Sequence, residues 1–277
     1  MPLLSLTRPS ETVWQISLNS PPDNRLTPPL LAELAEALDI VELEWRNAGG
    51  GIQDPKKRST YKNKGAGALV LTSGCERFFS NGLDYVGSLK VDNFFQDVFD
   101  PVLWRLMTFP LVTIGALNGH GAYHHYRFTF AGGMVIALAC DYRIMTSGKG
   151  WMCMSEVTFG APLPNSFGAF LPVLIPNPQH LRDTMLARRW TQPELLKIGL
   201  IDEIIKPEQV LKRAIELGER EGPKVAPGSW GLIKEDLRKP IIVASHEPAG
   251  SRRLDSGQIF FDRIAKDRKK LEAKAKL

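Results

Sequence analysis

The chain has 277 residues, of which 43% are hydrophobic and 23% are charged, and its formal net charge is +5. This composition is typical of a globular protein with enough chain for one large core. No apolar run approaches the ~20 residues of a membrane-spanning helix, which excludes an integral membrane protein of that kind.

The positive charge is concentrated at the end of the chain. From Asp262 onward, seven Lys and Arg residues stand against three Asp and Glu residues, so this segment carries +4 of the net charge. No aromatic interleaving or binding motif accompanies the charge, so we interpret it as the solvated face of a helix and expect no nucleic-acid partner.

The number and spacing of the cysteines and the first ten residues indicate the cellular compartment of the protein. The three cysteines, Cys75, Cys140 and Cys153, lack metal-ligand spacing and are too few for a disulfide framework. This pattern favours a reducing, intracellular setting and predicts no metal site. The first ten residues, MPLLSLTRPS, lack the basic start and apolar run of a secretory signal.

Strands and helices are predicted to alternate from the beginning of the chain. Residues 11–18 have the pattern of an early strand. Thr27 followed by proline is typical of a helix N-cap, and leucines at helical spacing predict a helix over 28–45. Residues 47–67 are rich in Gly, Lys and Asn and indicate a long exposed loop. The apolar run at 68–74 predicts a strand buried on both faces.

The same alternation continues through the middle of the chain. A helix is predicted over 92–107, with Pro101 as a kink or break. A strand at 111–119, an apolar helix that begins at Gly132-Gly133, and a strand at 141–145 follow. Strands that alternate with helices indicate an α/β fold.

The last third is predicted to be mainly helical. The expected helices, with one short extended piece at 201–205, lie at 166–175, 178–189, 192–199, 207–221 and 249–272.

Two glycine-containing segments are candidate ligand sites. One is the turn FFSNGLD at 78–84, and the other is the glycine pair at the start of the apolar helix. A helix N-terminus presents unpaired N–H groups, and glycines allow a ligand to approach the backbone closely. An N–H group from the turn at Gly82-Leu83 would complete a two-donor oxyanion hole. A tight turn and close helix packing explain each glycine cluster equally well when it is taken alone.

One carboxylate is surrounded by apolar sequence. Glu156 lies in WMCMSEVTFG, beside Met154 and Val157. Removal from water should raise the pKa of such a carboxyl group, so that it can exchange protons near neutral pH. The alternative is a glutamate at the end of a strand that points into water.

Together these segments carry a family resemblance. FFSNGLD, ALNGH, FAGGMVIALACDYRIM and MSEVTFGAPLP, in this order, resemble the crotonase (enoyl-CoA hydratase/isomerase) superfamily over about residues 11–215. The strongest likeness is to the peroxisomal Δ3,Δ2-enoyl-CoA isomerases of fungi and plants. The resemblance implies a crotonase-like α/β spiral of ββα units over 1–205 with an acyl-CoA site, and a helical region at 206–277 for oligomerisation or as a lid. It also implies a homotrimer or hexamer.

The resemblance also assigns chemical roles. Backbone N–H groups of Leu83 and Gly132 would bind the thioester oxygen, and CoA, which is part of the substrate, would be the ligand with no separate cofactor or metal. Hydratases of this superfamily use two glutamates to handle one water. The second matches Glu156, but the position of the first is Val135. A single carboxylate favours moving the double bond of a 3-enoyl-CoA over adding water.

The resemblance places CoA near Asn24-Arg25-Leu26, with Arg25 as a partner for the diphosphate. The alternative for Arg25 is a solvent-exposed arginine before a helix. Four aromatic residues are candidates for the acyl tunnel, although core packing explains each of them as well: Phe94, Phe95, Trp104 and Phe167.

One segment departs from the family pattern. About one residue separates ALNGH from FAGG in relatives, whereas Gly121–Thr129 stand between them here. Adjacent histidines in this loop, His124 and His125, are weak evidence for a metal or a base. The insertion either forms a surface bulge that spares the site or distorts the site and impairs catalysis.

The C-terminal Ala275-Lys276-Leu277 resembles the Ser-Lys-Leu address that the peroxisomal import receptor reads, although a helix rich in Ala and Lys can end this way by chance. We therefore expect an enoyl-CoA isomerase of fatty-acid β-oxidation in the peroxisome matrix. The alternatives are a hydratase-like enzyme of a secondary-metabolite pathway, a CoA-binding member impaired by the 121–129 insertion, and, on thin grounds, an RNA-binding protein.

Overall fold

The computed structural model describes residues 2–52, 54, 56, 64–118, 127–247, 259 and 261–269. The chain separates into two compact units, Met1–Ser245 and His246–Leu277, and residues 261–269 of the second unit are helical. None of the helices in the described ranges is long and apolar enough to cross a bilayer. The following predictions fall wholly or partly outside these ranges: the loop at 47–67, the insertion up to residue 126 with its two histidines, the ends of the helix at 249–272, and the C-terminal tripeptide.

A six-stranded sheet in the order β1-β2-β3-β5-β7-β10 forms the centre of the first unit. Only the β1–β2 pair is antiparallel within this sheet. The middle strands are buried on both faces, which confirms the prediction from their continuous apolar runs. The strands are β1 (Leu4–Ser10), β2 (Val13–Leu18), β3 (Ala68–Ser73), β5 (Val112–Leu117), β7 (Tyr142–Thr146) and β10 (Glu203–Ile205).

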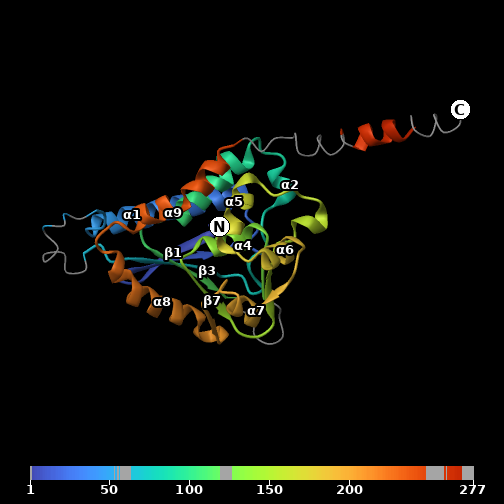
Figure 1. Cartoon of the computed structure of the whole chain (residues 1–277). Helices are drawn as coiled ribbons and strands as arrows, with labels where there is room; N and C mark the ends of the chain where they lie inside the picture. The colour runs from blue at the N-terminus through green and yellow to red at the C-terminus, as the bar shows by residue number, and fades with distance from the viewer. Residues whose placement is uncertain are drawn as a thin grey trace, which may run out of the picture. The chain divides into compact units, whose positions relative to one another are not determined.

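Helices cover both faces of this sheet (Figure 1). Helix α8 lies on one face, where its Val210, Ala214 and Leu217 pack on alternate residues of β3 and β5. The larger core lies on the other face and includes α1, α3, α4 and α5. The helices are α1 (Pro28–Asn47), α2 (Tyr85–Ser88), α3 (Asp100–Met107), α4 (Gly132–Ala139), α5 (Asn165–Leu174), α6 (Pro178–Met185), α7 (Gln192–Lys197), α8 (Val210–Glu221) and α9 (Trp230–Ser245).

A second, four-stranded sheet in the order β4-β6-β8-β9 was not predicted from the sequence. Its strands are too short for a period-two pattern to identify them: β4 (Phe78–Ser80), β6 (Arg127–Phe130), β8 (Gly150–Cys153) and β9 (Trp190–Thr191). β4, β6 and β8 run parallel. Parallel strands end at the same edge of a sheet, so the segments that follow these three strands come together.

Local signals at two helix boundaries were confirmed. The Leu30 N–H donates to Thr27 Oγ1 at 3.4 Å, so Thr27 is the N-cap of α1. The predicted break near Pro101 is real: a π-helical segment, η2 (Phe95–Phe99), ends where α3 begins. Helix α9 was not predicted; Pro240 lies inside it.

A buried ion pair joins α9 to the main sheet. Lys234 is 4% exposed, and its Nζ lies 3.0 Å from Asp141 Oδ2. The same carboxylate accepts hydrogen bonds from the Thr113 N–H at 2.9 Å and the Trp230 indole N–H at 3.2 Å. Lys234 also donates to the Leu111 carbonyl. These bonds satisfy both charges away from water.

We expect Lys234→Met to destabilise the protein by about 2–4 kcal/mol, because it leaves the Asp141 carboxylate buried without its cation. Urea unfolding measures this effect. The matched control is Lys239→Met on the exposed side of the same helix, which should change stability by less than about 0.5 kcal/mol. The double variant Lys234→Met with Asp141→Asn should recover part of the loss. Equal effects of Lys234→Met and Lys239→Met would contradict a structural role for the pair.

Candidate functional site

The turn after β4 lies directly against the start of α4. Gly82 has φ +82, and a Cβ atom built on it would lie 2.9 Å from both the Ala131 Cβ and the Phe130 carbonyl oxygen. A Cβ on Gly133 would lie 2.7 Å from Ser80 Cβ. Atoms cannot approach this closely, so both positions require glycine for the two backbone segments to touch.

Two backbone N–H groups are available at this contact. Leu83 pairs with Leu26 in an isolated parallel β-bridge. The Leu26 N–H donates to the Gly82 carbonyl, and the Asp84 N–H donates to the Leu26 carbonyl. The N–H of Leu83 therefore points away from Leu26. Gly132 is the first residue of α4, and its N–H has no partner one turn earlier in that helix. A Cβ on Gly132 would lie 3.0 Å from Leu83 Cγ, so the two segments are neighbours.

The backbone before α4 is strained. Ala131 has φ +47 and ψ −125, a conformation that residues with a Cβ rarely adopt, and such strain costs on the order of 1–3 kcal/mol. Its N–H donates to the Cys153 carbonyl at 2.8 Å, which ties the start of α4 to the end of β8. Strain of this kind persists where the surrounding structure over-determines it, often at functional sites.

Glu156 follows β8 and begins a short 3-10 turn, Glu156–Phe159. Its side chain is buried, and its Oε2 atom has no hydrogen-bonding partner in the described part of the chain. Burial raises the pKa of Glu156 to about 7, and the backbone N–H groups of Glu156 and Ser155 oppose this rise only in part. The apolar neighbours predicted such a shift. Val157, however, is half-exposed, because the 3-10 turn carries it out of the core.

One cavity of about 460 Å³ brings these groups together. Glu156, Leu83 and Ala131 all contribute to its wall, and most of its remaining lining is apolar. This size and composition are typical of a small-molecule site. A larger hollow of about 820 Å³, lined in part by Arg8 and Trp14, shares no residue with it and contains no buried, unpaired carboxylate.

The cavity wall therefore combines one buried carboxyl group of raised pKa with Leu83, whose backbone segment contacts the start of α4. Backbone N–H donors stabilise negative charge that develops on a carbonyl oxygen. The carboxylate can remove a proton from the carbon next to that carbonyl.

Comparison with known proteins identifies the family. The sequence profile described as Enoyl-CoA hydratase/isomerase matches residues 58–242. The chain belongs to the enoyl-CoA hydratase/isomerase family. It is 30% identical to "Enoyl-CoA delta isomerase 3" of Arabidopsis thaliana over 201 residues, 69% of this chain and 77% of that protein. "Enoyl-CoA delta isomerase 2, peroxisomal" of the same plant is 29% identical over 203 residues, 69% of this chain and 78% of that protein.

Solved structures agree on the fold. Human mitochondrial delta3-delta2-enoyl-CoA isomerase has a TM-score of 0.66 and 23% identity, covering 96% of this chain and 93% of that one. The crotonase fold predicted from the sequence is confirmed, and the protein is an enzyme of this family with isomerase relatives.

The three residues predicted to bind CoA lie in different environments. Arg25 is half-exposed, lines the cavity and pairs with Asp23 at 3.1 Å. Asn24 is fully buried and holds the loops together: its amide nitrogen donates to the Leu18 and Phe79 carbonyls. Leu26 is buried beside the start of α4. Only Arg25 presents its side chain to the cavity, and CoA binding at this segment stays a prediction.

The position that carries a glutamate in the hydratases of this family is apolar here. Val135 is completely buried within α4. Of the four aromatic candidates for the acyl tunnel, Phe95 and Phe167 line the cavity, whereas Phe94 packs in the core and Trp104 packs against it. Sequence reasoning did not identify Asp100 as a buried carboxyl group close to this wall; an acidic residue directly before Pro101 in an apolar stretch was the available signal.

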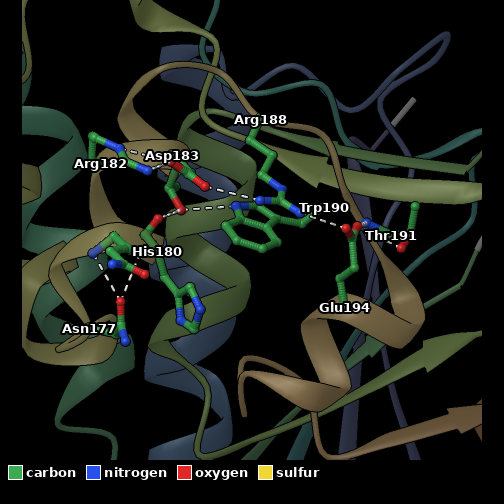
Figure 2. Close-up of polar contacts among 10 residues, drawn as sticks. Asn177, His180, Arg182, Asp183, Arg188, Trp190, Thr191 and Glu194 are labelled. Atoms are coloured by element: carbon green, nitrogen blue, oxygen red, sulfur yellow. Dashed lines mark hydrogen bonds and ion pairs between the residues drawn. The ribbon is translucent and has the colours of Figure 1, made fainter.

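A polar network supports the strand that leads to Glu156 (Figure 2). Trp190 of β9, which pairs with β8, donates its indole N–H to Thr184 Oγ1 at 2.9 Å. The Arg188 guanidinium lies 4.1 Å from the centre of the Trp190 ring. Arg188 also pairs with Asp183 at 3.0 Å and Glu194 at 2.8 Å. The network holds the edge of the second sheet in place.

The last residues of the predicted insertion, up to Thr129, belong to β6 of the four-stranded sheet. Thr129 is buried in β6, opposite Ser80 of β4 and Met152 of β8. The chain thus enters α4 from a strand paired on both sides. His124 and His125 lie outside the described residues.

Glu156→Gln should stabilise the protein in a pH-dependent way. The folded state retains the Glu156 proton up to about pH 7, whereas the unfolded state loses it near pH 4.5. Wild-type stability therefore falls, by roughly 3 kcal/mol, as pH rises across this window, and the variant avoids this loss. Urea unfolding at about pH 5, 6, 7 and 8 tests the difference, with exposed Glu208→Gln as control. A difference that does not vary with pH would contradict the raised pKa.

Proposed function

We propose that the protein is a Δ3,Δ2-enoyl-CoA isomerase in which Glu156 is the only proton carrier. The observation that carries this proposal is the buried carboxyl group of Glu156, with a pKa of about 7, in a cavity whose wall also includes Leu83 and Ala131, the residue before Gly132. The isomerase names of the plant relatives support the same reaction.

The proposed reaction proceeds in two proton transfers. The Glu156 carboxylate removes a proton from C2 of a 3-enoyl-CoA, and the electron pair moves onto the thioester oxygen. The N–H groups of Leu83 and Gly132 stabilise this enolate oxygen. The protonated Glu156 then delivers its proton to C4, the double bond forms between C2 and C3, and the carboxylate is regenerated.

Water addition is disfavoured on the same geometry. A hydratase must deprotonate and orient a water molecule and also protonate the neighbouring carbon. Val135 contributes no ionisable group to α4, and the cavity wall is mainly apolar. We assign the CoA diphosphate to Arg25, the one predicted CoA residue whose side chain reaches the cavity.

We expect purified protein to convert 3-hexenoyl-CoA to the conjugated 2-enoyl thioester without adding water. Its kcat/KM should rise with pH through an apparent pKa of about 7, because Glu156 must be ionised to act as a base. Glu156→Gln should lower kcat by roughly 10²–10⁴-fold and leave acyl-CoA affinity unchanged.

Glu208→Gln, an exposed glutamate in a 3-10 turn, is the control and should keep full activity. Near-native turnover by Glu156→Gln would show that another group carries the proton. Hydration by the wild type would favour the hydratase-like alternative, and acyl-CoA binding without turnover would favour the impaired member.

We also propose that the enzyme acts in β-oxidation in the peroxisome matrix, as a homotrimer or hexamer. The name of the peroxisomal plant relative supports this compartment, although the human structural neighbour is mitochondrial. The import receptor would read Ala275-Lys276-Leu277.

Deleting these three residues from a fluorescent fusion with a free C-terminus should move it from peroxisomes to the cytosol. Ala275→Ser, which creates Ser-Lys-Leu, is the matched control and should preserve import. Unchanged localisation after the deletion would refute the assignment of the tripeptide.

A further inference from the structure

Two groups of apolar side chains line the cavity and differ in their exposure to solvent. Tyr85, Leu89 and Phe159 are 36%, 69% and 49% exposed, so they mark the mouth of the cavity. Phe95 is partly buried against the core, and Phe167 is only 1% exposed although it lines the same cavity. Phe95 and Phe167 therefore form an inner wall, where the cavity meets the hydrophobic core.

The inner wall is supported from behind. The rings of Phe95 and Phe167 meet edge-to-face, with their centres 5.9 Å apart. Phe99 is fully buried and packs on both rings, at 6.0 Å from Phe95 and 5.3 Å from Phe167. Edge-to-face contacts fix the orientation of the rings, and a close-packed interior offers them little space to turn into. The wall is therefore a fixed stop.

Two elements bring these rings together. Phe95 and Phe99 both belong to the π-helical segment η2, and Phe167 lies in the first turn of α5. π-helical turns are rare and often occur at functional positions. Phe94, directly before η2, and Phe170, one turn further along α5, are buried in the core. Core packing explains those two residues, whereas Phe95 and Phe167 also border an open space.

We propose that the inner wall of Phe95 and Phe167 limits the length of the acyl chain, so that the substrates of this enzyme are short- and medium-chain 3-enoyl-CoA thioesters. The inference rests on the isomerase proposed above and defines its substrate class.

The size of the cavity gives the limit. A hydrocarbon chain gains most when it leaves water, so it should extend from the thioester towards the buried inner wall and not towards the exposed mouth. At about 30 Å³ for each water-sized group, a cavity of about 460 Å³ holds roughly 15 such groups. The thioester occupies part of this space, which leaves room for an acyl chain of roughly ten carbons or fewer.

The test measures the binding of saturated acyl-CoAs and the turnover of 3-enoyl-CoAs over a series of increasing chain length. Each methylene group that enters the cavity should strengthen wild-type binding by roughly fourfold. This gain should stop at roughly ten carbons, and longer chains should lose about tenfold or more in affinity and in kcat/KM, because they press against the wall.

Phe167→Ala and the milder Phe167→Leu should each move the optimum to longer chains, the first by about two carbons or more, because they open space behind the wall. Phe95→Leu should act in the same direction. Phe170→Leu is the matched control: it removes the same ring from the same helix, but Phe170 does not line the cavity, so the optimum should stay unchanged.

Wild-type binding that still strengthens beyond about twelve carbons would overturn the inference, since the chain would then leave through the mouth. So would an optimum that neither Phe167 variant moves, or one that Phe170→Leu moves equally, because general loosening of the core would then explain the shift. Binding of the saturated series needs no turnover. The expected optimum in binding without any isomerisation would therefore uphold the wall and reject the proposed reaction.

Discussion

The turn after β4 and the start of α4 can touch only because no side chain stands between them. This constraint falls on Gly82 and Gly133, where any Cβ atom would collide with the facing segment. It also explains why Ala131 keeps a strained conformation: the chain must leave β6 and begin α4 at this contact. The small second sheet satisfies the constraint, because β4, β6 and β8 are parallel and end at the same edge.

The same edge determines the electrostatics of Glu156. Glu156 follows the end of β8, and the burial of its side chain raises the pKa of its carboxyl group to about 7. Ionisation is costly there, so the carboxylate that forms is a stronger base than one in water. In the reaction proposed above, the low polarity that raises this pKa would also strengthen the attraction between an enolate oxygen and the two N–H donors. A single environment would then favour both the removal of the proton and the charge that results.

The parts that could be predicted from the sequence are those that local patterns determine. Thr27 caps α1 because its hydroxyl and the proline that follows act within one turn, and β3 and β5 are recognisable as continuous apolar runs. The burial of Glu156 also followed from its immediate neighbours. The strands of the second sheet could not be predicted, since three or four residues carry too little periodicity.

The roles of side chains that depend on distant segments could not be predicted from the sequence either. Asn24 and Arg25 are adjacent in sequence, yet Asn24 is buried by hydrogen bonds to β2 and β4 whereas Arg25 faces the cavity. The burial of Asp100 arises because α5 brings Ser166 and Phe167 against the start of α3.

The buried carboxyl groups Glu156 and Asp100 differ in their position relative to the cavity, because only Glu156 lines it. A second carboxyl group on α4 would hold water near the reacting carbons, and its charge would raise the cost of ionising Glu156. Val135 removes both effects. Asp100 supplies a buried acid on the other side of the Phe95–Phe99–Phe167 rings, where it cannot activate water at the thioester. One carboxyl group thus lies on the wall of the cavity, and the aromatic rings separate the other carboxyl group from it.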